Sequence, residues 1–257
     1  MVNFLSAAHT DTGIVKKINQ DAFCLKTART PNMNIALAVL CDGMGGLKSG
    51  ELASALIVNE FSNWFENSLA SRVAAGQQLS NIRDEWDRMI IEKSNRIMRY
   101  GDEHGISLGT TLTAVLLFDR EYLFAQVGDS RLYKLSSEIV QLTRDQTIVA
   151  REVEQHRLTP EQARVDKRKN ILLQCVGASK NVQPEYGFGR INLGEAFMLC
   201  SDGFRHEVRE EEMLGVLSPA LHQEERTMKQ GLIDLIETNK ARGERDNITS
   251  IMIKVIG

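Results

Sequence analysis

The order of apolar segments along the chain is the feature that most constrains its fold. Short apolar runs typical of β-strands come first and two segments with helical apolar spacing follow, and this order repeats before a final strand. A parallel, doubly wound sheet requires strands and helices to alternate one by one, so this order argues against it. The sequence therefore predicts an α+β fold with two antiparallel β-sheets flanked by pairs of helices.

The expected elements divide the chain as follows. We expect strands at 4–10, 22–27, 34–41, 186–193, 195–201 and 247–256, and helices at about 52–65, 80–100, 209–217 and 222–240. Between residues 109 and 142, four β-rich runs separated by turns predict an antiparallel meander. Residues 143–170 are polar and are expected to form an excursion over the surface. Within it, Thr159 and Pro160 predict the start of a short, exposed helix.

Composition excludes several classes of protein. The chain has 257 residues and a formal net charge of −3, with Lys and Arg scattered along it, so we expect no nucleic-acid partner. The apolar runs are far shorter than the roughly 20 residues that span a bilayer, so we expect no membrane segment. The first residues lack the pattern of a secretory signal, and the four cysteines are widely spaced with no C-x-x-C pair. We therefore predict a single cytoplasmic domain, 1–257, with reduced cysteines in its core.

A glycine-rich turn follows Asp42 in "LAVLCDGMGGLKSGE" and raises two alternatives, a phosphate-binding loop or a metal site. A Walker A loop needs glycine before the Lys-Ser pair, but Leu47 precedes Lys48 and Ser49. The dinucleotide fingerprint fails as well, because Lys48 stands where its third glycine is required. The metal alternative rests on Asp42, a carboxylate at the end of an apolar strand.

Four more aspartates occupy similar positions in the sequence. Asp202 and Asp129 follow apolar runs, whereas Asp21 and Asp246 precede strands. If these strand ends meet, five like charges would be costly to bury without cations. A set of oxygen donors that includes no His or Cys favours hard ions such as Mg²⁺ or Mn²⁺ over zinc.

Six motifs carry a resemblance to a known family. They are "TGIVKKINQD" (12–21), "LCDGMGG" (40–46), "GTTL" (109–112), "VGDSRLY" (127–133), "CSDGF" (200–204) and "RDNIT" (245–249). In this order they resemble the metal-dependent protein phosphatases of the 2C type, particularly the compact bacterial enzymes, over nearly the whole chain. The resemblance implies a four-layer α/β/β/α sandwich, a binuclear Mn²⁺/Mg²⁺ centre and hydrolysis of phosphoserine and phosphothreonine in proteins.

The resemblance also implies roles for individual residues. Asp42 resembles the carboxylate that bridges both ions, and the carbonyl of Gly43 resembles a backbone ligand. Asp202 and Asp246 look like ligands of the second ion, to which Asp21 contributes directly or through water. Asp129 looks like a ligand of a third, weaker site shared with Asp202.

The same family pattern implies partners and a mechanism. Residues 143–170 correspond to its variable flap, and the expected partners are phosphorylated proteins that a Ser/Thr kinase has modified, acted on by a monomer. Water held between two divalent ions loses a proton near neutral pH and attacks the phosphate directly, so no covalent intermediate is needed. Accordingly, the sequence has neither a G-x-S-x-G elbow nor a C-x5-R loop. A fold of this kind without activity, used only as a binding module, is the competing alternative, but such proteins usually lose metal-site carboxylates.

Two positions depart from the pattern of many relatives. Lys16 stands where arginine binds the substrate phosphate; it keeps the charge and loses the bidentate geometry, and Lys17 is a possible substitute. Met44 stands where some relatives have a histidine that acts as general acid. His9 and His206 lie near motif residues, but a structural role is the more frequent one for such histidines. Thr110 and Thr111 are expected to hold the backbone near the site, and Arg131 either orients Asp129 or pairs with a surface acid.

Overall fold

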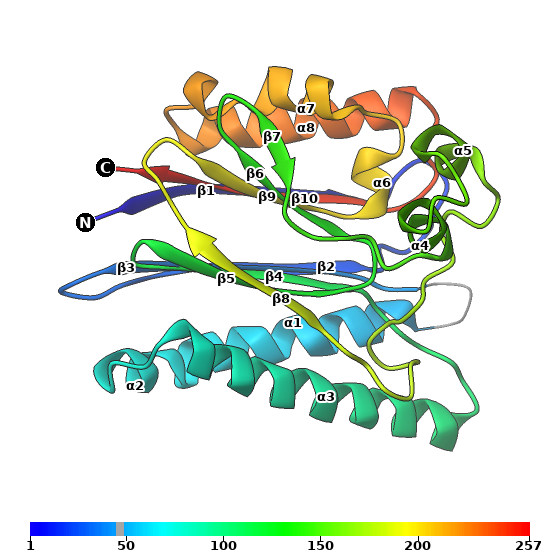
Figure 1. The fold of residues 1–257 in the computed structure, drawn as a ribbon, viewed down its shortest axis with the longest axis horizontal. Coiled ribbons are helices and arrows are strands. Elements are labelled where there is room, and N and C mark those ends of the chain that lie inside the picture. The colour runs from blue at the N-terminus through cyan, green and yellow to red at the C-terminus, as the bar shows by residue number, and fades with distance from the viewer. Residues whose placement is uncertain (45–48) are drawn as a thin grey trace.

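The computed structural model describes residues 1–44 and 49–257, and it contains two five-stranded antiparallel sheets that lie face to face (Figure 1). One sheet has the order β1-β10-β9-β6-β7, with β1 Asn3–Asp11, β10 Ile248–Ile256, β9 Ala196–Cys200, β6 Arg131–Leu135 and β7 Ile139–Gln141. The other has the order β2-β3-β4-β5-β8, with β2 Asp21–Arg29, β3 Asn34–Asp42, β4 Leu112–Phe118, β5 Glu121–Val127 and β8 Glu185–Arg190. The expected glycine-rich turn at Gly45 to Lys48 lies outside the described residues.

Helices cover both outer faces, so the four-layer sandwich is confirmed (Figure 1). The sheet that contains β3 is covered by α1 (Gly50–Asn67) and α3 (Leu79–His104), which the short α2 (Leu69–Ala74) connects. The other sheet is covered by α7 (Glu210–Leu217) and α8 (Glu225–Ala241), with the 3-10 turn η1 (Pro219–Leu221) between them. None of the helices in the described ranges 1–44 and 49–257 is both long and apolar enough to span a membrane.

Strand β3 shows why the sequence encodes this architecture. Its side chains at Leu37 and Val39 belong to the core beneath the helices, whereas Ala38 and Leu40 belong to the core between the sheets. A strand buried on both faces is apolar at every position, which explains the continuous run "IALAVLC". A third core, with Phe204 and Leu232, lies between the other sheet and its helices.

The segment expected to form one meander is divided between the two sheets, and that prediction is wrong in this respect. Strands β4 and β5 pair in one sheet, whereas β6 and β7 pair in the other. The chain crosses at Gly128, where φ is +100°, a conformation that glycine adopts without steric cost. A Cβ atom there would lie 2.7 Å from the Thr111 side chain. Turn signals mark where a strand ends but not which sheet the next strand joins, so the sequence did not reveal the crossing.

The polar stretch 143–170 contains two short helices. Helix α5 (Pro160–Val165) begins as expected, since the Thr159 hydroxyl accepts a hydrogen bond from the Gln162 amide in a capping box. Helix α4 (Ile148–Glu154) was not expected from its largely polar surroundings. Both helices lie at the end of the sandwich opposite the two chain termini (Figure 1).

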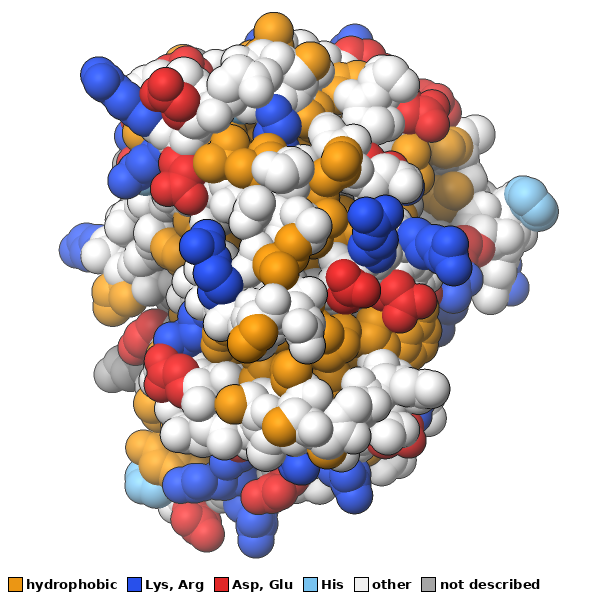
Figure 2. All heavy atoms as spheres, turned by 90° about the vertical axis from the view of Figure 1, so that its left-hand side faces the viewer, with side chains coloured by type: hydrophobic (Ala, Val, Ile, Leu, Met, Phe, Trp, Pro, Cys, Tyr) orange, Lys and Arg blue, Asp and Glu red, His pale blue; other side chains and the backbone are white. Residues whose placement is uncertain are grey.

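The end that carries the termini has a mixed surface. Figure 2 shows Lys and Arg side chains interspersed there with Asp and Glu, around a band of hydrophobic side chains. The four cysteines are free, and all except the half-buried Cys24 are buried, as expected for small core residues.

Trp86 of α3 anchors the core beneath the helices and provides a test of the packing. It is fully buried, and its ring lies edge-on to Phe61 at 4.9 Å and to Trp64 at 5.5 Å between centroids. We expect Trp86→Ala to lower the free energy of unfolding by about 3–5 kcal/mol, measured by urea denaturation, because the cavity cannot collapse between two layers. Ile91→Ala, on the exposed side of the same helix, is the control and should cost less than about 1 kcal/mol. Equal losses for the two variants would contradict this packing.

Candidate metal centre

The five aspartates come from separate strand ends. Asp21 begins β2 and faces Asp42, which ends β3, across the antiparallel pair. Asp202 begins α6 (Asp202–Arg205), a single helical turn directly after β9, and Asp246 lies two residues before β10. Asp129 lies in the crossing between β5 and β6. An antiparallel pair brings the start of one strand beside the end of the next, which is why these distant positions meet.

An open cavity of about 430 Å³ collects most of the predicted site residues. Its lining comprises Lys16, Asp42, Gly43, Met44, Thr111, Asp129, Asn170, Leu172, Asp202 and Asp246. Asp21 is not part of the lining, but its charge acts on Asp42 across the strand pair. The structure thus brings together six of the seven predicted residues in one cavity and places the seventh directly behind it.

Backbone contacts hold the end of β3 in place. The Thr110 hydroxyl and the Thr111 amide each donate to the Asp42 carbonyl at 2.9 Å, and the Asp42 amide donates to the Thr111 hydroxyl at 2.9 Å. The expected role of the two threonines is therefore confirmed. At Gly43 a Cβ atom would lie 2.4 Å from the carbonyl oxygen of Gly50, so only glycine fits there.

Asn247, which no prediction singled out, fixes the segment before β2. Its Oδ1 accepts from the Gln20 amide at 2.9 Å, and its Nδ2 donates to the carbonyls of Thr12 and Ile18 at 2.9 and 3.2 Å. These three bonds position Lys16 and Asp21 relative to Asp246. The sequence signal was only its place in the motif "RDNIT".

The carboxylates disturb one another's protonation. Burial, against a hydrogen bond from Thr249 and together with the charge of Asp202, raises the pKa of Asp21 from 3.8 to about 7. Burial and the charge of Asp202 raise the pKa of Asp129 to about 7 as well, although Arg205 opposes the change. Burial and the charges of Asp21 and Asp202 raise the pKa of Asp42 well above its usual value. The ionised forms of these groups need a cation.

The donor set fits hard divalent ions. Oδ1 of Asp21 and Oδ1 of Asp202 are buried without a hydrogen-bond partner among the described residues, and the donors are all oxygens. Across residues 1–44 and 49–257, no three His, Cys, Asp or Glu side chains are already arranged around one ion. Binding would therefore require the carboxylates to turn toward the ion, which relieves the repulsion among them.

Lys16 is held by one of these carboxylates. Its Nζ lies 2.8 Å from Oδ1 of Asp246. Burial lowers the pKa of Lys16, but the hydrogen bond and charge of Asp246 outweigh it, so the pKa is raised overall and the lysine is charged. A positive group thus faces the cavity beside the carboxylates.

His9, His206 and Arg131 lie near motif residues in the sequence, and the structure shows which groups surround them. His206 has Nδ1 3.0 Å from Oε2 of Glu244 and Nε2 3.5 Å from Oδ2 of Asp202. His9 lies within β1, opposite Ser250. Arg131 forms a bidentate pair with Asp145, at 2.8 and 2.9 Å, and so resolves the alternative left open for it in favour of an acid other than Asp129.

Arg205 is the residue that contacts Asp129, and sequence reasoning missed it. Its Nη2 donates to the Asp129 carbonyl at 3.0 Å and lies 3.4 Å from Oδ2 of the same residue. The two residues are 76 positions apart, and no local pattern signals such a pair.

Comparison with known proteins agrees with the motifs and the sandwich. The sequence profile described as Protein phosphatase 2C matches residues 8–237. The chain belongs to the protein phosphatase 2C family. The expectation of a phosphatase fold is thereby confirmed at the level of the family.

Relatives within this family match the chain over almost its full length. A protein of Streptococcus pyogenes named putative protein phosphatase 2C-type is 30% identical over 95% of this chain and 94% of its own length. The structure of the S. agalactiae serine/threonine phosphatase superposes with a TM-score of 0.84 at 29% identity, covering 99% of this chain and 100% of that one. The catalytic domain of the serine/threonine protein phosphatase PstP, solved in complex with two manganese ions, superposes with a TM-score of 0.80 at 26% identity and full coverage of both chains.

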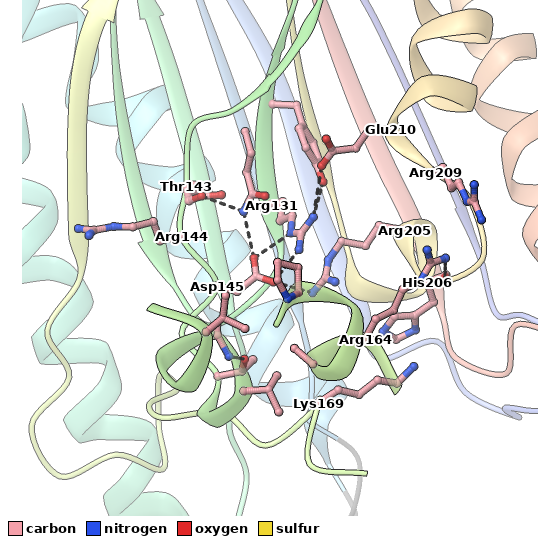
Figure 3. Close-up of a pocket in the computed structure, with 18 of the residues that line it drawn as sticks. Arg131, Thr143, Arg144, Asp145, Arg164, Lys169, Arg205, His206, Arg209 and Glu210 are labelled. Carbon is pink, nitrogen blue, oxygen red and sulfur yellow. Dashed lines mark hydrogen bonds and ion pairs between the residues drawn. The ribbon is translucent and has the colours of Figure 1, made fainter. Parts of the chain in front are cut away.

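A larger pocket, of about 1000 Å³, adjoins the aspartates in this member of the protein phosphatase 2C family (Figure 3). It lies between the 143–170 segment and the region of α6 and α7, and Asn170 lines both cavities. The Lys and Arg side chains that line it are Arg131, Arg144, Arg164, Lys169, Arg205 and Arg209. Of these, Arg131 and Arg205 converge on Asp145. The two cavities together form a path along the surface past the aspartates.

The raised pKa values predict how the metal-free phosphatase responds to pH. Asp21 and Asp129 hold protons in the folded state up to about pH 7 that the unfolded chain releases near pH 4. The free energy of unfolding should therefore fall as the pH rises from about 4 to 7. In EDTA we expect a loss of at least about 1 kcal/mol between pH 5 and 7.5, seen as a drop of about 2–4 °C in melting temperature.

Asp21→Asn should reduce this pH dependence, because it removes one of the carboxyl groups whose pKa is raised. Asp102→Asn, an exposed position on α3, serves as the matched control and should leave it unchanged. Stability that rises toward pH 7.5 in EDTA would contradict the proposed burial of protonated carboxyl groups.

Proposed function

We propose that this chain is a Mn²⁺- or Mg²⁺-dependent phosphatase that hydrolyses phosphoserine and phosphothreonine in proteins by direct attack of water. The observation that carries the proposal is the set of buried and half-buried aspartates at one end of the sandwich, which repel one another and include carboxylate oxygens without a partner among the described residues. The relative PstP, crystallised with two manganese ions, supports an assignment of the same kind here.

The residues that would hold two ions are Asp42 with the carbonyl of Gly43, and Asp202 with Asp246, supported by Asp21. When bound, such ions supply a water that is deprotonated near neutral pH and positive charge for the phosphoryl oxygens. The chain itself positions Asp42 through Thr110 and Thr111. The third ion expected on Asp129 and Asp202 is not part of this proposal, because Arg205 already contacts Asp129.

Lys16 is proposed to bind the substrate phosphate. It is charged and lines the cavity, and in the absence of metal it pairs with Asp246. If a cation takes over Asp246, the ammonium group is released toward the incoming phosphate. A lysine offers a single point charge instead of a fork, so it attracts the phosphate with less control of its orientation.

The substrate polypeptide is proposed to lie along the larger pocket. This pocket shares Asn170 with the aspartate cavity, and the 143–170 segment, the expected flap, forms one of its walls. The proposed enzyme thus comprises one catalytic domain that acts as a monomer on proteins modified by a Ser/Thr kinase.

Neither Met44 nor His206 is available to protonate the leaving alkoxide. Met44 has no ionisable group, and His206 already contacts Asp202 and Glu244. We therefore assign this proton to water, which can reach the open cavity.

Hydrolysis assays test the function directly. We expect the chain to hydrolyse p-nitrophenyl phosphate and a phosphothreonine peptide with Mn²⁺, and to lose this activity in EDTA. Asp202→Asn should lower kcat/KM more than about 100-fold, since losing an inner ligand should exceed the 10–100-fold cost typical of residues one shell further out. Asp102→Asn is the control for a loss of charge on the surface. Turnover without metal, or a folded wild type with no turnover, would refute the proposal.

Lys16→Ala tests phosphate binding. Removing a charged hydrogen bond worth about 1.5–3 kcal/mol should raise KM for the phosphopeptide about 10–100-fold. Lys17→Ala removes the same charge from the neighbouring, exposed position and should change KM little. If Lys17→Ala raises KM and Lys16→Ala does not, the phosphate is bound by Lys17.

A further inference from the structure

The position expected to hold a third ion already carries a positive charge from the chain. Asp129 is only 5% exposed, and Nη2 of Arg205 contacts both its carbonyl oxygen, at 3.0 Å, and its Oδ2, at 3.4 Å. A buried carboxylate is costly unless a cation accompanies it, and Arg205 is that cation. Asp129 differs in this respect from Asp21, whose Oδ1 has no partner in the described part of the chain.

Helix α6 explains why the arginine can reach this point. The helix is one turn long and begins with Asp202, so Arg205 follows three residues later and lies on the same side. The turn starts directly after β9, which is paired with β6, and Asp129 lies just before β6. Neighbouring strands thus bring the carboxylate and the guanidinium together.

The same nitrogen of Arg205, Nη2, also contacts a second carboxylate. It lies 3.4 Å from Oδ2 of Asp145, which in turn accepts two hydrogen bonds from Arg131. Figure 3 shows the side chains of Arg131, Asp145 and Arg205 side by side on the pocket wall. Asp129, Arg205, Asp145 and Arg131 therefore form a row in which acidic and basic side chains alternate.

The other charged groups near this row do not change the conclusion. Asp202 acts on Arg205 by its charge and contacts His206, and Glu210 lies 3.6 Å from Arg131 at the outer end. A divalent ion on Asp129 and Asp202 would have to displace the guanidinium from Asp129. Arg205 would then remain buried beside a second arginine and a new divalent charge.

We propose that Arg205 is a positioning residue that occupies the third cation position of this chain, so that the wild type binds two divalent ions and not three. The proposal rests on the two-ion centre proposed above. Arg205 would hold Asp129 in place and connect it, through Asp145, to the first residues of the 143–170 segment.

Counting bound Mn²⁺ tests the proposal without an activity assay. Calorimetric titration of the full chain should give two ions for the wild type and for Arg205→Lys, which retains the positive charge. Arg205→Gln removes the charge at similar length and should acquire a third site, with a Kd at least about tenfold below that of any third site in the wild type. Adding Asp129→Asn to Arg205→Gln should abolish the acquired site.

Controls separate this inference from folding defects and from the proposed function. Arg226→Gln, an exposed position on α8, should leave the count at two. If circular dichroism shows that Arg205→Gln does not fold, the single variant Asp129→Asn is used instead. The number of bound Mn²⁺ ions stays at two if Arg205 is the partner of Asp129, and it falls below the wild-type number if Asp129 binds an ion. Three ions in the wild type, or no third site in a folded Arg205→Gln, would overturn the role of Arg205. Fewer than two ions in the wild type would instead overturn the two-ion centre.

Discussion

Repulsion among five aspartates, all buried or half-buried, at one end of the sandwich is the interaction on which the rest of this structure depends. Burial and mutual charge raise the pKa values of Asp21, Asp42 and Asp129, so the folded chain tolerates these groups only with protons or cations. The sandwich supplies the energy to hold them, because three apolar cores extend along its length. The packing of these apolar cores therefore offsets the unfavourable repulsion among the aspartates.

The chain balances this charge in different ways at different positions. Lys16 accompanies Asp246, and Arg205 accompanies Asp129, whereas oxygens of Asp21 and Asp202 lack partners in the described residues. The two basic side chains differ in exposure, which is 37% for Lys16 and 13% for Arg205. Lys16 lies on a surface segment, while Arg205 is enclosed between two aspartates and cannot leave without exposing a buried charge. These environments suit the two proposed roles, in which Lys16 binds the substrate phosphate and Arg205 holds Asp129 in place.

Much of this could be read from sequence because it depends on short-range patterns. The apolar run of β3, the stripes of α1 and α3 and the cap at Thr159 each reflect a local period or a local hydrogen bond. The ends of strands were equally visible, so the aspartates and the threonines beside Asp42 could be named. The prediction of a single meander was wrong because the chain crosses at Gly128 and β6 joins the other sheet. That choice depends on the pairing of β6 with the distant strand β9. For Arg131 the sequence left two alternatives, Asp129 or another acid, and only the structure identified Asp145 as its partner.

The sequence by itself determined which residues carry the chemistry: carboxylates and a glycine at strand ends, in an order typical of the protein phosphatase 2C family. It could do so because the motifs are contiguous and strand ends are local features. Only the tertiary structure decided which charges face one another. Arg205 reaches Asp129 across 76 residues, and Lys16 reaches Asp246 because β1 pairs with β10, so strand pairing sets distances that no local pattern contains.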